Sequence, residues 1–230
     1  MGFFNKPFRV KSNTQMKGSD KKKLKVQLIA AFPLLTEDDL NNLIPTKDEI
    51  IQSKIYTFGG ESLLLYIHNR DTVFFQLEKE KTFYPSVYTL WKHPLLLPVF
   101  TTHPPVLAKL VNGADLMLPG IVVDESKGIK AYCDGKLEKG DIVSVNLTSN
   151  MAPVAIGRTW RSSEDMYMAV RRGKGVDILH TYGDQVQKLN LFFFKMCLIL
   201  FDQCNLQLKG FHRRYCRDPI AYDEELLTKD

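Results

Sequence analysis

Long hydrophobic runs, regularly spaced cysteines and nucleotide-binding motifs are all missing from this chain of 230 residues. No apolar run reaches the ~18 residues that a membrane-spanning helix needs, and the N-terminus lacks the apolar core of a secretory signal. Four irregularly spaced cysteines indicate no disulfide framework, which favours a reducing compartment. The phosphate-binding pattern GxxxxGK followed by Ser or Thr does not occur. We therefore expect a cytoplasmic protein that makes no membrane contact and does not itself use GTP.

Patterns typical of catalysis or metal binding are also missing. The five histidines have no spacing that suggests a nucleophile or an acid–base pair. Cys204, His212 and Cys216 are spaced too loosely for a zinc site. We expect no metal, no cofactor and no enzymatic activity.

Positive charge is concentrated at the N-terminus. Residues 1–25 contain eight Lys and Arg residues against the single acid Asp20, although the whole chain carries only +5. Such a basic end favours attraction to phosphate. A solvated lysine-rich helix face is the alternative that the same charges allow.

The first half of the chain predicts helices packed against an antiparallel meander, which is an α+β arrangement. Residues 8–11 alternate as a half-buried strand does, and Gly18-Ser19 begins a helix that Pro33 ends. Its apolar face contains Leu24 and Leu28, whereas its lysines point elsewhere. The further elements that we predict are a helix after Thr36 with a capping-box pattern, strands at 54–58, 63–68 and 73–78, and a helix over 84–91.

The stretch from Leu110 to Val122 organises the second half. A helix over 104–112 runs into Gly113, which suits the left-handed residue that closes a helix. A short buried strand and a tight Pro119-Gly120 turn follow, and a strand is expected to start at Ile121. Later segments predict strands at 142–147, 153–158 and 176–182 with a short helix after Ser162, which suits a small closed barrel.

The sequence of this stretch, Gly-Ala-Asp-Leu-Met-x-Pro-Gly-Ile, closely resembles the opening motif of the PUA domain, a small RNA-binding β-barrel. The resemblance implies RNA contacts along the helix-and-loop edge and the last strand. It assigns these contacts to Gly113, Ala114, Asp115, Leu116, Pro119 and Gly120, with Arg171, Arg172 and Lys174 beside them. A turn that any such barrel needs is the alternative reading of the glycines.

Other stretches are similar to the family of eukaryotic translation initiation factor 2D, also called ligatin. They are Phe8 to Asp20, Phe83-Tyr84-Pro85-Ser86-Val87-Tyr88-Thr89-Leu90-Trp91, Leu97 to Thr102, Ala152 to Gly157 and Leu179 to Tyr182. The related malignant T-cell-amplified protein matches less closely. We expect a pre-PUA α+β domain at 1–92, a PUA domain at 93–186 and an atypical tail at 187–230.

The resemblance implies a non-enzymatic factor that binds the small ribosomal subunit and its rRNA and delivers initiator or other tRNA to the P site without GTP. It also implies subunit recycling. In this context Lys17, Lys21, Lys22 and Lys23 become candidate ribosomal contacts. An RNA-modifying enzyme would need a separate catalytic domain, and the first 92 residues are too few for one.

This chain departs from the family pattern near Val186. The family continues into a polar linker there, whereas this chain has an apolar segment at 191–201. The winged-helix, SWIB-like and SUI1-like domains of the family are missing. The alternative function is therefore a truncated interaction module that occupies the ribosome or a partner without delivering tRNA. The segment at 191–201 is too short to span a bilayer. Three alternatives remain for it: it packs against the barrel, it binds a partner, or it is an exposed apolar end.

Overall fold

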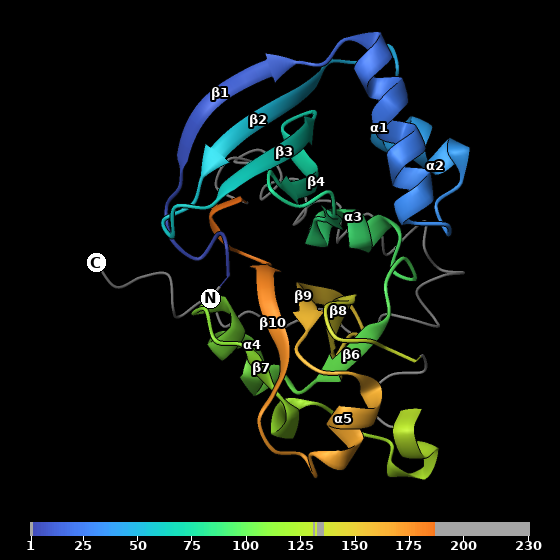
Figure 1. Cartoon of the computed structure of the whole chain (residues 1–230), viewed down its shortest axis with the longest axis vertical. Helices are drawn as coiled ribbons and strands as arrows, with labels where there is room; N and C mark the ends of the chain where they lie inside the picture. Colours follow the sequence, from blue (N-terminus) through green and yellow to red (C-terminus); the bar gives the residue numbers. More distant parts are fainter. Residues whose placement is uncertain (1, 131, 133–135, 187–230) are drawn as a thin grey trace.

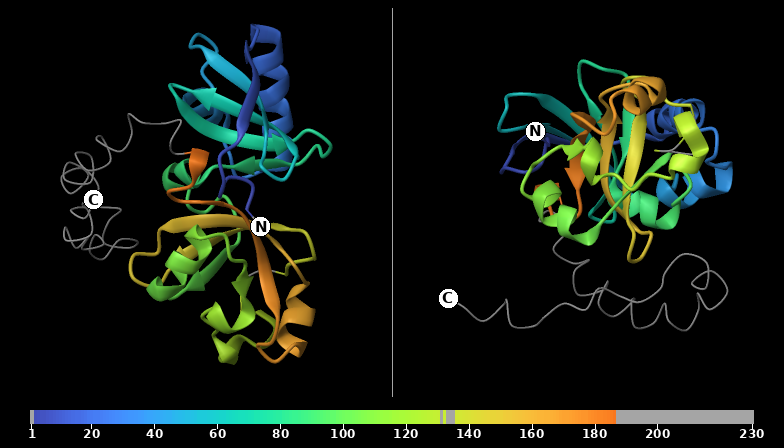
Figure 2. Two further views of the ribbon diagram at one scale, coloured as in Figure 1. Left: turned by 90° about the vertical axis from the view of Figure 1, so that its left-hand side faces the viewer. Right: turned by 90° about the horizontal axis from the view of Figure 1, so that it is seen from below.

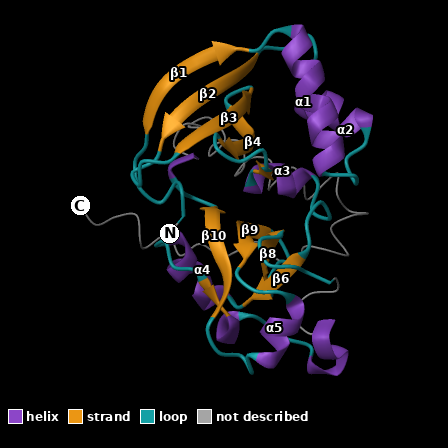
Figure 3. Cartoon of the chain, in the orientation of Figure 1, coloured by secondary structure: helices purple, strands orange, loops and turns teal. Residues whose placement is uncertain are grey.

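The computed structural model describes residues 2–130, 132 and 136–186, and the expected tail at 187–230 lies outside the described residues. Two five-stranded sheets are stacked along the long axis of the molecule, the first above the second in Figure 1. Figure 2 shows the same arrangement from two further directions, and Figure 3 separates helices from strands by colour. The chain is α+β, as the sequence predicted.

The first sheet is antiparallel throughout, in the order β1-β2-β3-β4-β5. Its strands are β1 (Arg9–Gln15), β2 (Ile50–Tyr56), β3 (Ser62–His68), β4 (Asp71–Leu77) and β5 (Phe83–Pro85), and its helices are α1 (Gly18–Ala31), α2 (Glu37–Leu43) and α3 (Val87–Lys92). Helix α1 buries Leu24 and Leu28 against a core that includes Phe74. The capping box predicted at Thr36 is confirmed, since its hydroxyl accepts from the Asp39 amide at 3.1 Å.

Two local predictions in this half were wrong. Every residue of β1 is exposed, so the strand is not half-buried: among the described elements it pairs only with β2, at the edge of the sheet. Residues 83–85 form a strand, and α3 starts only after Ser86, whose hydroxyl accepts from the Thr89 amide at 3.2 Å. The Ser86 cap outweighs the preference of Pro85 for a first helical turn.

The second sheet has the order β6-β8-β9-β10-β7, with β6 and β8 parallel and the other pairs antiparallel. Its strands are β6 (Val99–Thr102), β7 (Leu116–Met117), β8 (Ile142–Leu147), β9 (Pro153–Thr159) and β10 (Lys174–Thr181). The helices beside it are α4 (Pro104–Val111), α5 (Ser163–Met168) and the 3-10 segments η1 (Leu118–Gly120) and η2 (Glu125–Lys130).

A single bridge draws the two edges of this sheet together. Thr102 at the end of β6 pairs with Ile121, just beyond β7, and the Thr102 hydroxyl donates to the Gly120 carbonyl at 2.6 Å. The Val122 amide adds a bond to the Thr101 carbonyl at 2.8 Å. The strand expected from Ile121 onward is thus reduced to one bridge, and the barrel closes through a turn instead of a full ladder.

Two apolar clusters contain residues from both halves, and a third lies within the second half. Phe4 is fully buried at their junction, and its ring lies edge-on to His180 of β10 at 5.7 Å and to Phe75 of β4 at 5.2 Å. Backbone bonds hold this N-terminal segment, from the Phe3 amide to the Leu179 carbonyl at 2.9 Å and from the Gln185 amide to the Phe4 carbonyl at 3.0 Å. The N-terminus therefore lies between the halves, beside β10 (Figure 1).

Polar contacts fix the same junction. The Trp91 indole donates to the Pro153 carbonyl at 2.8 Å, and Arg158 of β9 pairs with Glu80 at 3.0 Å. Glu80 also accepts from the Tyr84 hydroxyl at 3.2 Å. Burial raises the pKa of Tyr84 to about 12, so its hydroxyl stays protonated and keeps this donor role. These contacts hold the halves in one orientation.

Lys21 is a structural residue, contrary to the expectation that the lysines of α1 point away from the core. Its side chain is 6% exposed, and its ammonium donates to the carbonyls of Asp48 at 2.6 Å and Thr46 at 3.2 Å. The sequence could not show this, because the two carbonyls belong to a loop 25 or more residues away. Lys21 fastens α1 to the chain that enters β2.

Replacing Lys21 by Met should therefore cost stability, because two carbonyls lose a charged donor while the aliphatic stem is kept. We expect K21M to lower the free energy of unfolding by about 2 kcal/mol. The matched variant K22M removes an exposed charge from the same helix and should change it by less than about 0.5 kcal/mol. Urea unfolding of both variants is the measurement, and equal effects would contradict the structural role of Lys21.

Candidate nucleic-acid interface

The helix end that opens the motif is built as predicted. Gly113 follows α4 with φ +93°, the left-handed conformation that glycine adopts at least cost. The Gly113 amide donates to the Leu110 carbonyl at 2.9 Å and the Ala114 amide to the Lys109 carbonyl at 3.0 Å, which satisfies the last turn of the helix. A side chain here would also collide with Asn5, whose Nδ2 would lie 2.5 Å from the added carbon. Two constraints thus select glycine.

Asp115 joins this helix end to β10. One carboxylate oxygen accepts from the Ile178 amide at 3.2 Å, and the other lies 3.2 Å from the ammonium of Lys174. Lys174 also pairs with Asp177. Burial works to lower the pKa of Lys174, but the hydrogen bonds that its ammonium donates to Asp177 and Asp115 outweigh burial and raise the pKa above the ordinary value. Both members of the Asp115–Lys174 pair are therefore engaged inside the protein.

The remaining motif residues divide into buried and exposed positions. Leu116 is fully buried in the core of the second sheet, so it supports the motif from within and is not placed to contact RNA. Ala114 and Pro119 are exposed, and Gly120 is half-buried with its carbonyl occupied by Thr102. The backbone of the turn, more than its side chains, is what this edge presents.

The loop before β10 carries the arginines that the sequence singled out. Arg171 and Arg172 are exposed, and the Arg171 guanidinium donates to the Ile121 carbonyl at 3.3 Å. This contact places the loop against the Pro119-Gly120 turn. Val170 and Arg171 have φ of 47° and 60°, which is costly for non-glycine residues and most of all for a β-branched one. The strained loop brings two guanidinium groups beside the motif.

The predicted RNA contacts form two groups and not one. Lys17, Lys22 and Lys23 are exposed on or next to α1, at the far end of the first sheet, whereas the motif and the arginine loop belong to the second sheet (Figure 1). Lys21 drops out of the first group because it is buried. Within the second group, Asp115, Leu116 and Lys174 position the exposed residues.

Sequence reasoning missed the partners of the histidines. His180 Nδ1 lies 2.6 Å from the carboxylate of Asp184, and both side chains are buried; Asp184 also accepts from the Thr181 and Val186 amides at 3.0 Å. His68 lies 3.1 Å from Asp48 at the surface. The spacing of four between His180 and Asp184 was the available signal. Their position among aromatic rings gives the pair a packing role.

The described part of the chain contains neither a metal-binding cluster nor a membrane-spanning helix. No group of three or more His, Cys, Asp or Glu side chains there is arranged to hold a metal ion. Nor does any described helix combine the length and apolar character needed to cross a membrane.

Family models match both halves. The model described as "Pre-PUA-like domain" matches residues 4–94, and the one described as "elF2D, PUA domain" matches residues 97–185. Translation machinery-associated protein 20 of Schizosaccharomyces pombe is 30% identical over 185 residues, which are 80% of this chain and 96% of that protein. The chain belongs to the family of translation initiation factor 2D and translation machinery-associated protein 20.

Longer relatives are more similar in sequence. Eukaryotic translation initiation factor 2D of Oryctolagus cuniculus is 46% identical and that of Homo sapiens 45% identical, each over 183 residues or 80% of this chain. These residues are only 31% and 30% of the two relatives. The chain thus matches about a third of the length of the initiation factors.

Solved structures confirm the fold. A hypothetical protein of Pyrococcus horikoshii superimposes with a TM-score of 0.55 and 23% identity, covering 77% of this chain and 99% of that one. A PUA domain protein of Aeropyrum pernix, in a tartrate complex, gives a TM-score of 0.57 and 20% identity, covering 80% and 92%. Both likenesses extend over the two halves of the described chain.

The strained loop generates a stability prediction. Val170 is 76% exposed, so replacing it by Gly removes little packing while relieving a left-handed β-branched residue. We expect V170G to raise the free energy of unfolding by about 1 kcal/mol, the strain relieved less the entropy that glycine gains on unfolding. V170A keeps a Cβ and should show a smaller gain. Denaturant unfolding tests both, and a destabilised V170G would mean that the loop conformation is not strained.

Proposed function

We propose that this chain is a non-enzymatic, RNA-binding translation factor of the cytoplasm that acts on the small ribosomal subunit. Its family consists of proteins named for translation, and its second half matches a PUA domain, the type of barrel whose RNA-binding edge contains the motif described above. The division into residues 1–92 and 93–186 is part of this proposal.

The observation that carries the proposal is the exposed pair Arg171 and Arg172 beside a turn whose backbone lies open. A guanidinium fork suits phosphate oxygens, and the turn of Ala114, Pro119 and Gly120 lets a backbone approach without a bulky side chain in the way. Asp115 and Lys174 hold this edge in place from inside. Lys17, Lys22 and Lys23 form a second, more distant phosphate-binding surface in the proposal.

The finer activity that we propose is GTP-independent delivery of initiator or other tRNA to the P site, with a role in subunit recycling. The alternative is a truncated interaction module that binds the subunit or a partner without delivering tRNA. The chain spans 30–31% of the length of the initiation factors that it matches. Both versions require subunit binding.

The first experiment removes charge from the proposed edge. The variant R171A/R172A should bind purified small subunits and their rRNA roughly tenfold more weakly. The slope of log affinity against log salt should fall by up to about 2, because each phosphate contact contributes about 0.9. The control K79A/K81A removes two exposed charges from the loop before β5 and should bind as the unmodified chain does. Equal affinities for both variants would remove this edge from the proposal.

The second experiment separates the two versions. Co-sedimentation of the unmodified chain with small subunits at low salt tests binding, and delivery of tRNA by this chain alone tests the finer activity. Binding without delivery would select the interaction module, and no co-sedimentation would overturn both versions. A modified nucleoside formed in the RNA during incubation would contradict the non-enzymatic assignment.

A further inference from the structure

Trp160 is an exposed tryptophan immediately after β9, and the function proposed above makes no use of it. Its side chain is 41% exposed, whereas Trp91 is held at the junction by its bond to Pro153. The ammonium of Lys174 lies 3.9 Å from the centre of the Trp160 ring, and that of Lys139 lies 5.4 Å from it. An exposed aromatic ring held beside two cations is the combination that stacking sites for nucleic-acid bases use.

The ring is held firmly by its surroundings. The Trp160 amide donates to the Gly175 carbonyl at 2.8 Å, which fastens its backbone to the start of β10. Lys174, which supports the ring, is itself locked by Asp115 and Asp177. A stacking platform that is already rigid loses little entropy when a ligand binds.

A depression of about 440 Å³ opens in front of this platform. Its lining consists of Lys139, Trp160, Arg161, Asp165, Met168 and Ala169. Lys174 contacts the ring but is not among the residues that line the depression. The depression therefore offers one aromatic surface, one flexible thioether, two cations and one carboxylate.

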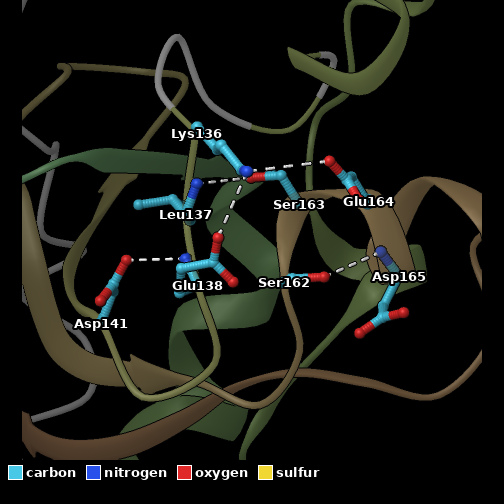
Figure 4. A network of polar contacts seen from close by, with 8 residues as sticks. All are labelled: Lys136, Leu137, Glu138, Asp141, Ser162, Ser163, Glu164 and Asp165. Carbon is cyan, nitrogen blue, oxygen red and sulfur yellow. Dashed lines mark hydrogen bonds and ion pairs between the residues drawn. The ribbon is translucent and has the colours of Figure 1, made fainter.

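The frame around the depression is fastened by a network of polar contacts (Figure 4). The Leu137 amide donates to the Ser163 hydroxyl and the Ser163 amide to the Leu137 carbonyl, both at 2.9 Å, which ties the segment before Lys139 to α5. Ser162 caps the same helix by accepting from the Asp165 amide at 3.1 Å, and the Asp165 carboxylate points away from that contact (Figure 4).

We propose that this depression binds a nucleotide of single-stranded RNA, with its base stacked on Trp160 and its phosphate paired with Lys139 and Arg161. Every base presents a flat π-face to an indole, and two cations match the charge of the adjacent phosphates. Met168, which is 75% exposed, closes over the base from α5. This inference rests on the proposed RNA-binding function and adds a third RNA contact, joined to the motif through Lys174.

The carboxylate of Asp165 gives the depression a base preference. An ionised carboxylate only accepts hydrogen bonds, so it favours cytosine and adenine, whose exocyclic amino group carries two N–H donors, over uracil, which offers only its N3–H. Oligonucleotides of cytosine or adenine should bind more tightly than those of uracil. The variant D165N, which can also donate, should reduce this difference.

The experiment measures the binding of fluorescently labelled six-nucleotide oligo(C), oligo(A) and oligo(U) to the full chain by anisotropy. W160A should weaken binding of oligo(C) roughly tenfold, in line with the loss of one stacked base. W160F keeps a stacking face and should recover most of the affinity. The control Y167A removes an exposed aromatic side chain of α5 that does not line the depression, and it should bind as the unmodified chain does.

The outcomes distinguish this site from the function on which it rests. If W160A binds as tightly as the unmodified chain while R171A/R172A binds weakly, the depression is not an RNA site and the proposed function stands. If neither the unmodified chain nor any variant binds RNA or the small subunit, the proposed function fails and this inference fails with it. Equal losses in W160A and W160F, with thermal unfolding unchanged, would show that stacking is not the mode of binding.

Discussion

The contacts of the Asp115 carboxylate determine how the end of α4, the following turn and β10 lie relative to one another. One oxygen takes an amide of β10 and the other takes Lys174, so a single half-buried group links two elements that are about 60 residues apart in sequence. Removing an acceptor of this kind leaves a cation and an amide without their partner, which costs more than the bond itself contributes. The exposed turn and the arginine loop are placed by this arrangement.

Features set by neighbouring residues could be predicted from the sequence. The sequence predicted the helix caps at Thr36 and Ser162, because a cap forms between residues that lie within one turn of the helix. The helix end at Gly113 could be predicted for the same reason. The hairpin between β3 and β4 turns at Asn69 and Arg70, both with positive φ, in the gap left between the strands predicted at 63–68 and 73–78. The similarity of the motif to PUA domains predicted the fold, which the spacing of apolar and polar residues alone did not determine.

Features set by distant residues could not be predicted. Lys21 and Leu116 were both assigned to RNA binding, yet one is buried under a loop and the other in a core, because burial depends on what the rest of the chain places over a residue. Lys174 was selected for its charge, and its two acidic partners and the Trp160 ring became visible only in three dimensions. The sequence identified the segments that form this edge, and packing decided which of their side chains face outward.

The buried junction around Phe4 and His180 has a consequence for how this chain would engage a large RNA. Because apolar clusters contain residues from both halves, the lysines of α1 and the edge beside β10 are held at a fixed separation. Two weak contacts on a rigid body bind as one event, since the second forms at an effective concentration that no flexible linker dilutes. A rigid protein of this kind also selects RNA by geometry. Both of its contacts can form only on an RNA surface whose phosphates lie at the same separation, and other RNA surfaces can form only one of them.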